Sequence, residues 1–314
     1  MSPTLADLRS AAARLADIAH RTPVQTSSNL DALAGATLFF KCENFQRGGA
    51  YKFRGALNAV RSFSDAQAAR GVVTHSSGNH ATCLSLAARL RGIPAFIVVP
   101  RNAPLITQRA IAAYGGRLTL CEPTLAARQA EADRIQRETG AVVVHPYDDP
   151  LVIAGQATVA LELLEQTGPL DVLIAPVSGG GLLSGLCLAA AALAPQTEVW
   201  GAEPALADDA FRSLREGKLL ANTNPATIAD GLRASLSERT FDIIRQHARG
   251  IVTVTEAQII SAMRLIWERM KLVVEPSAAV PLAAVLAAPD KFRGKRVGLV
   301  LTGGNVDLDQ LPWQ

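Results

Sequence analysis

The chain has 314 residues, of which 49% are hydrophobic and 19% are charged, and its formal net charge is +3. This balance is ordinary for a core-forming protein with one large domain or two moderate ones. The basic residues form no run and do not alternate with aromatic residues, which disfavours nucleic-acid binding. No apolar run is long enough to span a membrane, so we expect no membrane partner.

Short apolar runs alternate along the chain with alanine-rich amphipathic stretches. After a first helix within residues 1–21, the apolar runs predict strands at 37–41, 71–74, 95–99, 117–121, 141–144, 172–177, 198–202, 250–254 and 297–301. The amphipathic stretches predict helices at 53–62, 80–91, 106–114, 124–138, 153–166, 182–193, 256–269 and 276–286. This alternation predicts an α/β fold with open, parallel, twisted sheets flanked by helices.

The segment 71–148 forms a self-contained β-α-β-α series whose length is close to that of a small domain. We therefore predict a small domain at 71–148, inserted into a large domain built from 1–70 and 149–314. The four cysteines lie far apart and form no CxxC pair, which is typical of reduced, mostly buried thiols in a cytoplasmic protein.

Lys52 is the first candidate for chemistry, because it lies between Tyr51 and Phe53, directly before a predicted helix. Aromatic neighbours can desolvate a lysine, which lowers its pKa and makes the neutral amine available to react with a carbonyl group. The commoner alternative for an isolated lysine is a surface side chain that extends past two rings into solvent. The motifs elsewhere in the chain favour the reactive lysine.

A glycine-rich turn at Ser178–Gly181 follows one predicted strand and precedes the helix at 182–193. Glycines let backbone N–H groups approach a phosphate, and the start of a helix favours an anion. The turn also suggests a dinucleotide-binding fingerprint, with Glu203 about twenty residues further on. The spacing of that fingerprint fails, because its third glycine would have to stand at position 184. Ser184 occupies that position, and Gly185 comes one position late.

A second polar turn, Ser76–His80, follows the predicted strand 71–74. Ligands of open α/β sheets usually bind at such strand ends. Ser77 could donate to a substrate carboxylate or move a proton, and Asn79 could bind a cofactor oxygen. The alternative for the serines and Asn79 is capping of the following helix, and His80 is more typical of a structural residue at a helix start than of a general base.

Two further groups lie at predicted strand ends. Thr302 is followed by two glycines and Asn305, and its hydroxyl could meet a pyridine nitrogen or simply belong to a turn. Glu203 and Asp209 could bind a hard cation such as Mg²⁺ or Ca²⁺, or could be helix-start acids without a metal.

A reactive lysine, an anion-binding turn and polar strand ends are together the parts of a pyridoxal phosphate site. In order along the chain, these motifs resemble the fold type II pyridoxal-phosphate enzymes of the serine/threonine dehydratase and serine racemase group, which share a tryptophan synthase β-like fold. The resemblance extends over about residues 5–308. Further matching segments are 22–23, 43–46, 145–146, 153–156, 228–231 and 274–277.

The resemblance implies a role for each motif. Lys52 would be covalently joined to the cofactor. The other residues implied to bind the cofactor are Phe53, Asn79, Ser178, Gly179, Gly180, Gly181, Leu182, Glu275 and Thr302. Those implied to bind the substrate are Ser76, Ser77, His80 and Arg128, with Ser77 also catalytic. Those implied to bind the cation are Glu203, Ala207, through its carbonyl, and Asp209. A homodimer is also implied.

The resulting prediction is an ammonia-lyase that removes water from L-threonine or L-serine and gives a 2-oxo acid and ammonia. Three departures from the family bear on the substrate: Ala50 replaces a small hydroxyl residue, Ser178 replaces a glycine, and Tyr147 stands where a racemase often has Asn. Arg128 lies where the racemase group has an arginine, so serine racemisation stays open, and Ala50 leaves open the dehydration of 3-hydroxyaspartate or phenylserine. From other classes, a nicotinamide-dependent oxidoreductase and a non-catalytic amino-acid sensor also stay open.

Overall fold

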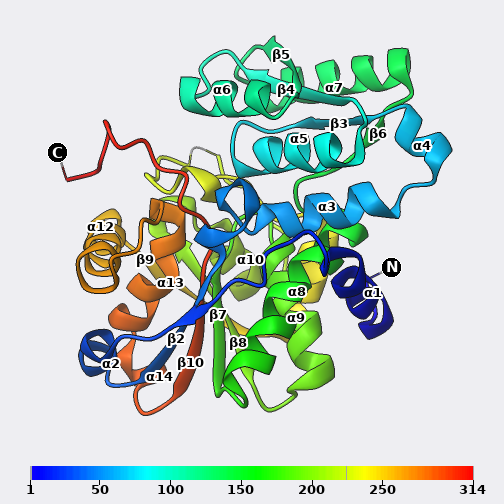
Figure 1. The fold of residues 1–314 in the computed structure, drawn as a ribbon. Coiled ribbons are helices and arrows are strands. Elements are labelled where there is room, and N and C mark those ends of the chain that lie inside the picture. The colour runs from blue at the N-terminus through cyan, green and yellow to red at the C-terminus, as the bar shows by residue number, and fades with distance from the viewer. Residues whose placement is uncertain (1, 224, 314) are drawn as a thin grey trace.

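The computed structural model describes residues 2–223 and 225–313. The larger of its two sheets has six strands (Figure 1). Its strands run in the order β1-β2-β10-β7-β8-β9. Their bounds are β1 (Val24–Gln25), β2 (Thr37–Cys42), β7 (Val172–Pro176), β8 (Glu198–Pro204), β9 (Ala248–Val254) and β10 (Arg296–Leu301). All neighbours pair in parallel except β1 and β2, which are antiparallel. The short edge strand β1 was not predicted, because two residues form no periodic pattern.

A smaller, four-stranded sheet lies above it in Figure 1, with all its strands parallel in the order β5-β4-β3-β6. Its strands are β3 (Val72–His75), β4 (Ala95–Pro100), β5 (Arg117–Cys121) and β6 (Val142–Val143). All four fall between residues 71 and 148. The two sheets confirm the predicted fold class, whereas the domain boundaries stay a prediction.

Helices cover both faces of the large sheet, with α13 packed against β7, β8, β9 and β10, and α9 against β7 and β8 from the other side (Figure 1). The predicted helices have the bounds α1 (Leu5–Leu15), α3 (Lys52–Ser62), α5 (Asn79–Arg91), α6 (Leu105–Ala113), α7 (Leu125–Thr139), α8 (Pro150–Thr167), α9 (Gly181–Leu193), α12 (Glu256–Leu265) and α13 (Pro276–Ala287). The helices without a prediction are α2 (Ser28–Ala34), α4 (Asp65–Ala69), α10 (Asp209–Glu216), α11 (Glu238–His247) and α14 (Pro289–Phe292). Within the described residues, no helix is both long and apolar enough to cross a membrane.

Helices α3 and α8 cross at two glycines close to Lys52. A β-carbon added at Gly155 would lie 2.7 Å from the Arg54 carbonyl oxygen, and one at Gly55 would lie 2.4 Å from Gln156 Nε2. Any larger residue would force the two helices apart. The close crossing therefore holds the beginning of α3, and with it Lys52, against the core.

Candidate functional site

Lys52 is the first residue of α3, and its amine is enclosed by protein. Its Nζ donates a hydrogen bond to the Pro146 carbonyl oxygen at 2.7 Å and lies 5.3 Å from the centre of the Tyr51 ring. Burial lowers the pKa of Lys52 to about 8. About a tenth of the amine is therefore neutral at pH 7, far more than for an ordinary lysine, and neutral amine is the form that a lysine nucleophile requires.

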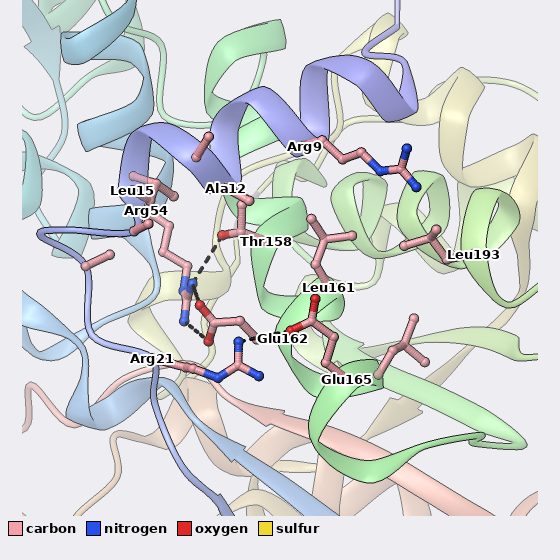
Figure 2. Close-up of a pocket in the computed structure, with 14 residues that line it drawn as sticks. Arg9, Ala12, Leu15, Arg21, Arg54, Thr158, Leu161, Glu162, Glu165 and Leu193 are labelled. Atoms are coloured by element: carbon pink, nitrogen blue, oxygen red, sulfur yellow. Dashed lines mark hydrogen bonds and ion pairs between the residues drawn. The ribbon is translucent and has the colours of Figure 1, made fainter.

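A buried ion-pair network fixes the backbone beside Lys52. Arg54 donates to Glu43 Oε2 at 2.7 Å. Figure 2 shows two further partners of Arg54, Glu162 Oε1 at 2.7 Å and Thr158 Oγ1 at 3.2 Å. Burial opposes the charge of Arg54, but the two carboxylates outweigh it and raise its pKa. Breaking such a pair leaves an uncompensated buried charge, so the network holds α3 firmly in place.

A cavity of 720 Å³ lies on the other side of this network, between α1, α8 and α9 (Figure 2). Arg54, Thr158 and Glu162 form part of its wall, but none of the predicted site residues lines it. We therefore place the site not in this cavity but around the amine of Lys52.

The glycine-rich turn between β7 and α9 has the geometry of an anion-binding loop. Gly180 has φ +86°, and a β-carbon there would lie 2.7 Å from Leu236 Cδ2, so only glycine fits. Ser178 Oγ accepts from the backbone N–H of Ala234 and donates to its carbonyl, each at 3.0 Å, which pins the turn. No side chain caps the N-terminus of α9, so its first N–H groups remain available to a phosphate.

Tyr147 connects this turn to Lys52. A β-carbon added at Gly179 would lie 2.3 Å from Tyr147 Cδ1, so the tyrosine ring lies directly on that glycine. The preceding residue, Pro146, accepts the hydrogen bond from Lys52. The predicted reactive lysine and phosphate loop are thus brought to the same place.

The Ser76–His80 turn lies between the end of β3 and the start of α5, as predicted. The N-cap residue of α5 is Gly78, and no side chain caps the helix. Ser76 Oγ only accepts a 3.4 Å bond from the Gly78 N–H, and Ser77 Oγ has no hydrogen bond within the described residues. The capping alternative is therefore wrong for both serines, whose hydroxyls are available to a ligand.

His80 in the same turn is buried, with 2% of its surface exposed. Its Nε2 donates to the Val144 carbonyl at 3.1 Å, and burial lowers its pKa to about 3. The ring is therefore neutral, which agrees with a structural residue and not with a general base. Direct substrate binding by His80 stays a prediction.

Asn79, Glu275 and Asn305 form a chain of hydrogen bonds beside the end of β10. Asn79 Nδ2 donates to both carboxyl oxygens of Glu275 at 2.9 and 3.0 Å, and Asn305 Nδ2 donates to Asn79 Oδ1 at 2.8 Å. Burial, reinforced by the charge of Asp230, raises the pKa of Glu275 to about 8. The carboxyl group is therefore mostly protonated at neutral pH. The partnership of Asn305 was not predicted, because its partners are distant in sequence.

Thr302 follows β10 and is 3% exposed. Its carbonyl oxygen accepts a 3.0 Å hydrogen bond from the N–H of Tyr51, so the end of β10 lies against the residue before Lys52. Its hydroxyl has no hydrogen bond within the described residues. A hydroxyl without a hydrogen-bond partner suits a ring nitrogen, and this role of Thr302 stays a prediction.

Arg128 lies near the N-terminus of α7 and is half-buried. Within the described part of the chain, its guanidinium makes no ion pair or hydrogen bond. Burial lowers the pKa of His75, and the charge of Arg128 lowers it further. The same charge opposes the burial-driven rise in the pKa of Tyr147. A half-buried cation without an ion pair in the described residues therefore acts electrostatically on His75, which precedes the serine turn, and on Tyr147, whose ring lies on Gly179.

Glu203 and Asp209 form a buried acidic pair at the end of β8 and the start of α10. Burial and the charge of Asp209 raise the pKa of Glu203 well above its ordinary value, and burial raises the pKa of Asp209 to about 6. Across residues 2–223 and 225–313, neither carboxylate has a Lys or Arg partner. Both accept hydrogen bonds from backbone or amide N–H groups, and Arg212, which pairs with Asp208, acts on them only at a distance. Two carboxylates without an ion pair of their own suit a hard cation. The contribution of the Ala207 carbonyl stays a prediction.

These features fit pyridoxal phosphate. Within the described residues, the start of α9 has no side-chain cap and suits the phosphate, Lys52 has a lowered pKa and suits the aldehyde, and the unbonded hydroxyl of Thr302 suits the ring nitrogen. The contribution of Pro146 was missed, because a backbone carbonyl leaves no mark on the sequence apart from the proline itself.

Comparisons with known proteins agree with this geometry. The chain is 53% identical over 311 residues to the β-hydroxyaspartate dehydratase of Paracoccus denitrificans, with 99% of each chain covered. It is 50% identical over 305 residues to a serine racemase of Arabidopsis thaliana, with 95% of this chain and 92% of the relative covered. The structure of maize serine racemase superimposes with a TM-score of 0.96 at 44% identity, covering 98% of this chain and 95% of that one. Residues 15–303 match the family described as pyridoxal-phosphate dependent enzyme, and the chain belongs to that family.

Proposed function

We propose that the chain is a dehydratase that removes water from 3-hydroxyaspartate and gives a 2-oxo acid and ammonia. The observation that carries the choice of an acidic substrate is the unpaired, half-buried Arg128 beside His75 and Tyr147. A second substrate carboxylate needs a cation, and a guanidinium is the best match for it. The 53% identity to a β-hydroxyaspartate dehydratase supports the same substrate.

Lys52 would hold the cofactor and take the α-proton of the substrate. When bound, pyridoxal phosphate supplies the electron sink for the charge that develops at the α-carbon. The lowered pKa of Lys52 supports a role as general base, since its amine can be neutral near pH 8. Ser76, Ser77 and His80 would lie around the substrate α-carboxylate, with the two free serine hydroxyls as donors.

The remaining residues would bind and tune the cofactor. Ser178, the three glycines after it and Leu182 would bind the phosphate through backbone N–H groups at the start of α9. Asn79, held by Glu275, and Phe53 would lie beside the ring, and Thr302 would meet the ring nitrogen. Because a neutral hydroxyl does not protonate that nitrogen, the site favours prompt loss of the β-hydroxyl.

Two alternatives within the family remain candidates. Dehydration of L-serine or L-threonine would use the same cofactor-binding and α-carboxylate-binding residues, but it would not need Arg128. Racemisation of serine would use Ser77 as the proton donor and acceptor on the face opposite Lys52, which its free hydroxyl supports. The 50% identity to a serine racemase favours keeping racemisation as the second candidate.

We also infer a homodimer in the cytoplasm. Phe45 and Val273 are 46% and 47% exposed, and the Asn44 side chain joins their segments by a 3.2 Å hydrogen bond to the Val273 carbonyl. Such apolar exposure favours a protein contact. The four cysteines are free and buried, which suits a reducing compartment. Sedimentation of the purified chain tests the dimer.

The substrate is tested by measuring ammonia release from 3-hydroxyaspartate, L-serine and L-threonine, together with D-serine formation. Arg128→Met should lower kcat/KM for 3-hydroxyaspartate ~100-fold and for L-serine less than ~3-fold. The matched control is Arg137→Met, an exposed arginine in the last turn of the same helix, which should change neither value. Equal losses for both substrates, or a wild-type preference for L-serine, would contradict the acidic substrate.

A further inference from the structure

The turn at residues 145–148, between β6 and α8, touches both halves of the proposed site. The Pro146 carbonyl accepts the hydrogen bond from Lys52 Nζ at 2.7 Å. The next residue, Tyr147, lies with its ring on Gly179 of the glycine loop. The conformation of this one turn therefore sets both the position of the Lys52 amine and the position of the Tyr147 ring on the glycine loop.

The side chain of His145 holds this turn from within. Its Nδ1 accepts the backbone N–H of Asp148 at 2.9 Å and, more weakly, that of Tyr147 at 3.4 Å. Nδ1 must then be the unprotonated nitrogen, and the neutral ring carries its proton on Nε2. A side chain that hydrogen-bonds to the backbone two and three residues later fixes a local turn.

The ring of His145 is itself fixed by its neighbours. It meets the Tyr147 ring edge-on at 4.6 Å between centroids and the His75 ring edge-on at 6.1 Å. Burial, together with the charges of His75 and Lys52, lowers the pKa of His145 to about 4, although the charge of Asp148 opposes this shift. The ring is therefore neutral near pH 7 and keeps its acceptor. Asp148 separately pairs with Arg239 at 2.8 Å, so the far end of the turn has its own anchor.

We propose that His145 is a positioning residue whose Nδ1 holds the 145–148 turn, so that the Pro146 carbonyl orients the Lys52 amine and Tyr147 covers the glycine loop. The inference rests on the proposed roles of Lys52 and that loop. A histidine that merely filled space would be replaceable by any ring of similar size. If the acceptor matters, a side chain with an acceptor at the same distance from the backbone should do better than a phenyl ring.

Two variants separate these possibilities. His145→Phe keeps a ring but removes the acceptor, and His145→Asn removes the ring but keeps an acceptor oxygen near the position of Nδ1. His247→Phe is the control, because His247, in the last turn of α11, has no hydrogen bond within the described residues. The first measurement is hydrogen exchange of the Tyr147 and Asp148 amides in the cofactor-free protein. The second is the rate at which pyridoxal phosphate becomes attached to Lys52, trapped by borohydride and located by peptide mass spectrometry.

His145→Phe should speed exchange at both amides by ~10-fold and slow attachment by a similar factor, while His145→Asn should stay within ~3-fold of wild type. The control should match wild type in both measurements. Wild-type behaviour of a folded His145→Phe would overturn the proposal. If that variant does not fold, a His145→Asn that loses as much as His145→Ala would overturn it instead. If wild-type Lys52 takes up no cofactor, the proposed function fails, whereas the exchange measurement still tests the turn.

Discussion

Lys41 and Lys52 are two lysines with enclosed amines and very different partners. Lys41, in β2, donates to Glu162 Oε2 at 2.7 Å, to the Thr22 carbonyl at 2.8 Å and to Gln166 Oε1 at 2.9 Å. Lys52 donates to one carbonyl and, within the described residues, has no carboxylate beside it. Burial lowers the pKa of both, but only Lys41 has carboxylates that act against the shift.

This difference separates a structural lysine from a reactive one. A compensated ammonium group is held in its charged form and cannot act as a nucleophile, whereas an uncompensated one releases its proton near neutral pH. Burial alone therefore does not identify the functional lysine. The absence of a counter-ion does.

Lys52→Ala gives the largest expected effect. Turnover should fall by at least ~10⁴-fold, because both the attachment point of the cofactor and the proposed base are lost. The free energy of unfolding of the cofactor-free protein near pH 7 should not fall, because relief of the buried charge offsets the single hydrogen bond that is removed. Ammonia release and urea unfolding measure the two quantities, and full activity in this variant would refute the site.

Lys41→Met should have the opposite profile. Removing one member of a buried ion-pair network costs about 3 kcal/mol, because Glu162 loses one of its two cations. Urea unfolding of the cofactor-free protein measures this loss, while kcat per folded molecule should stay within ~3-fold of wild type. Lys291→Met, which removes an exposed pair with Asp290, is the control and should cost less than about 0.5 kcal/mol. A loss of activity without a loss of stability would reverse the assignment of the two lysines.

The two lysines also show how far the sequence predicts this molecule. Lys52 could be singled out because its aromatic neighbours are adjacent in the chain. Lys41 could not, because Glu162 lies 121 residues away and only the folded α8 brings it near β2. The apolar strands and the turns that follow them were predictable from local pattern. Helices such as α10 were missed because they are short, and α10 has only eight residues. The hydrogen bonds within the 145–148 turn were missed because they join the His145 side chain to backbone N–H groups, which leave no pattern in the sequence.

The acidic pair Glu203 and Asp209 extends the comparison to carboxylates. Glu162 is neutralised by Arg54 and Lys41, whereas the acidic pair has backbone and amide donors but, within the described residues, no ion pair. Arg212, which pairs with Asp208, acts on the two carboxylates only at a distance. Saturating Mg²⁺ or Ca²⁺ should therefore stabilise the folded protein by about 1–3 kcal/mol, measured as a rise in melting temperature. Asp209→Asn should abolish this rise, and EDTA should reverse it.

The cation effect should also depend on pH. Protonation of Asp209, whose pKa is about 6, removes a ligand charge, so the rise should shrink as the pH falls through about 6. If the cation still raises the melting temperature of Asp209→Asn, or raises that of wild type equally from about pH 5 to about pH 8, the cation binds elsewhere.

The smallest expected effect is the titration of Lys52 in the stability of the cofactor-free protein. Its pKa is about 8 when folded against an ordinary value of 10.5, so between these values the unfolded chain binds a proton that the folded chain has released. Raising the pH through this window therefore favours the folded state, by at most about 1.4 kcal/mol per pH unit. Below pH 8 both states are protonated, and the cost of burying the charge is present in full.

The test is the free energy of unfolding of wild type minus that of Lys52→Met, measured by urea at about pH 7.5, 8.5 and 9.5. Subtraction cancels the contribution of every titratable group that the two proteins share, which leaves the contribution of Lys52. This difference in the free energy of unfolding should rise steadily with pH. A difference that stays flat with pH would mean that Lys52 is not desolvated, and the contrast with Lys41 would then rest on geometry alone.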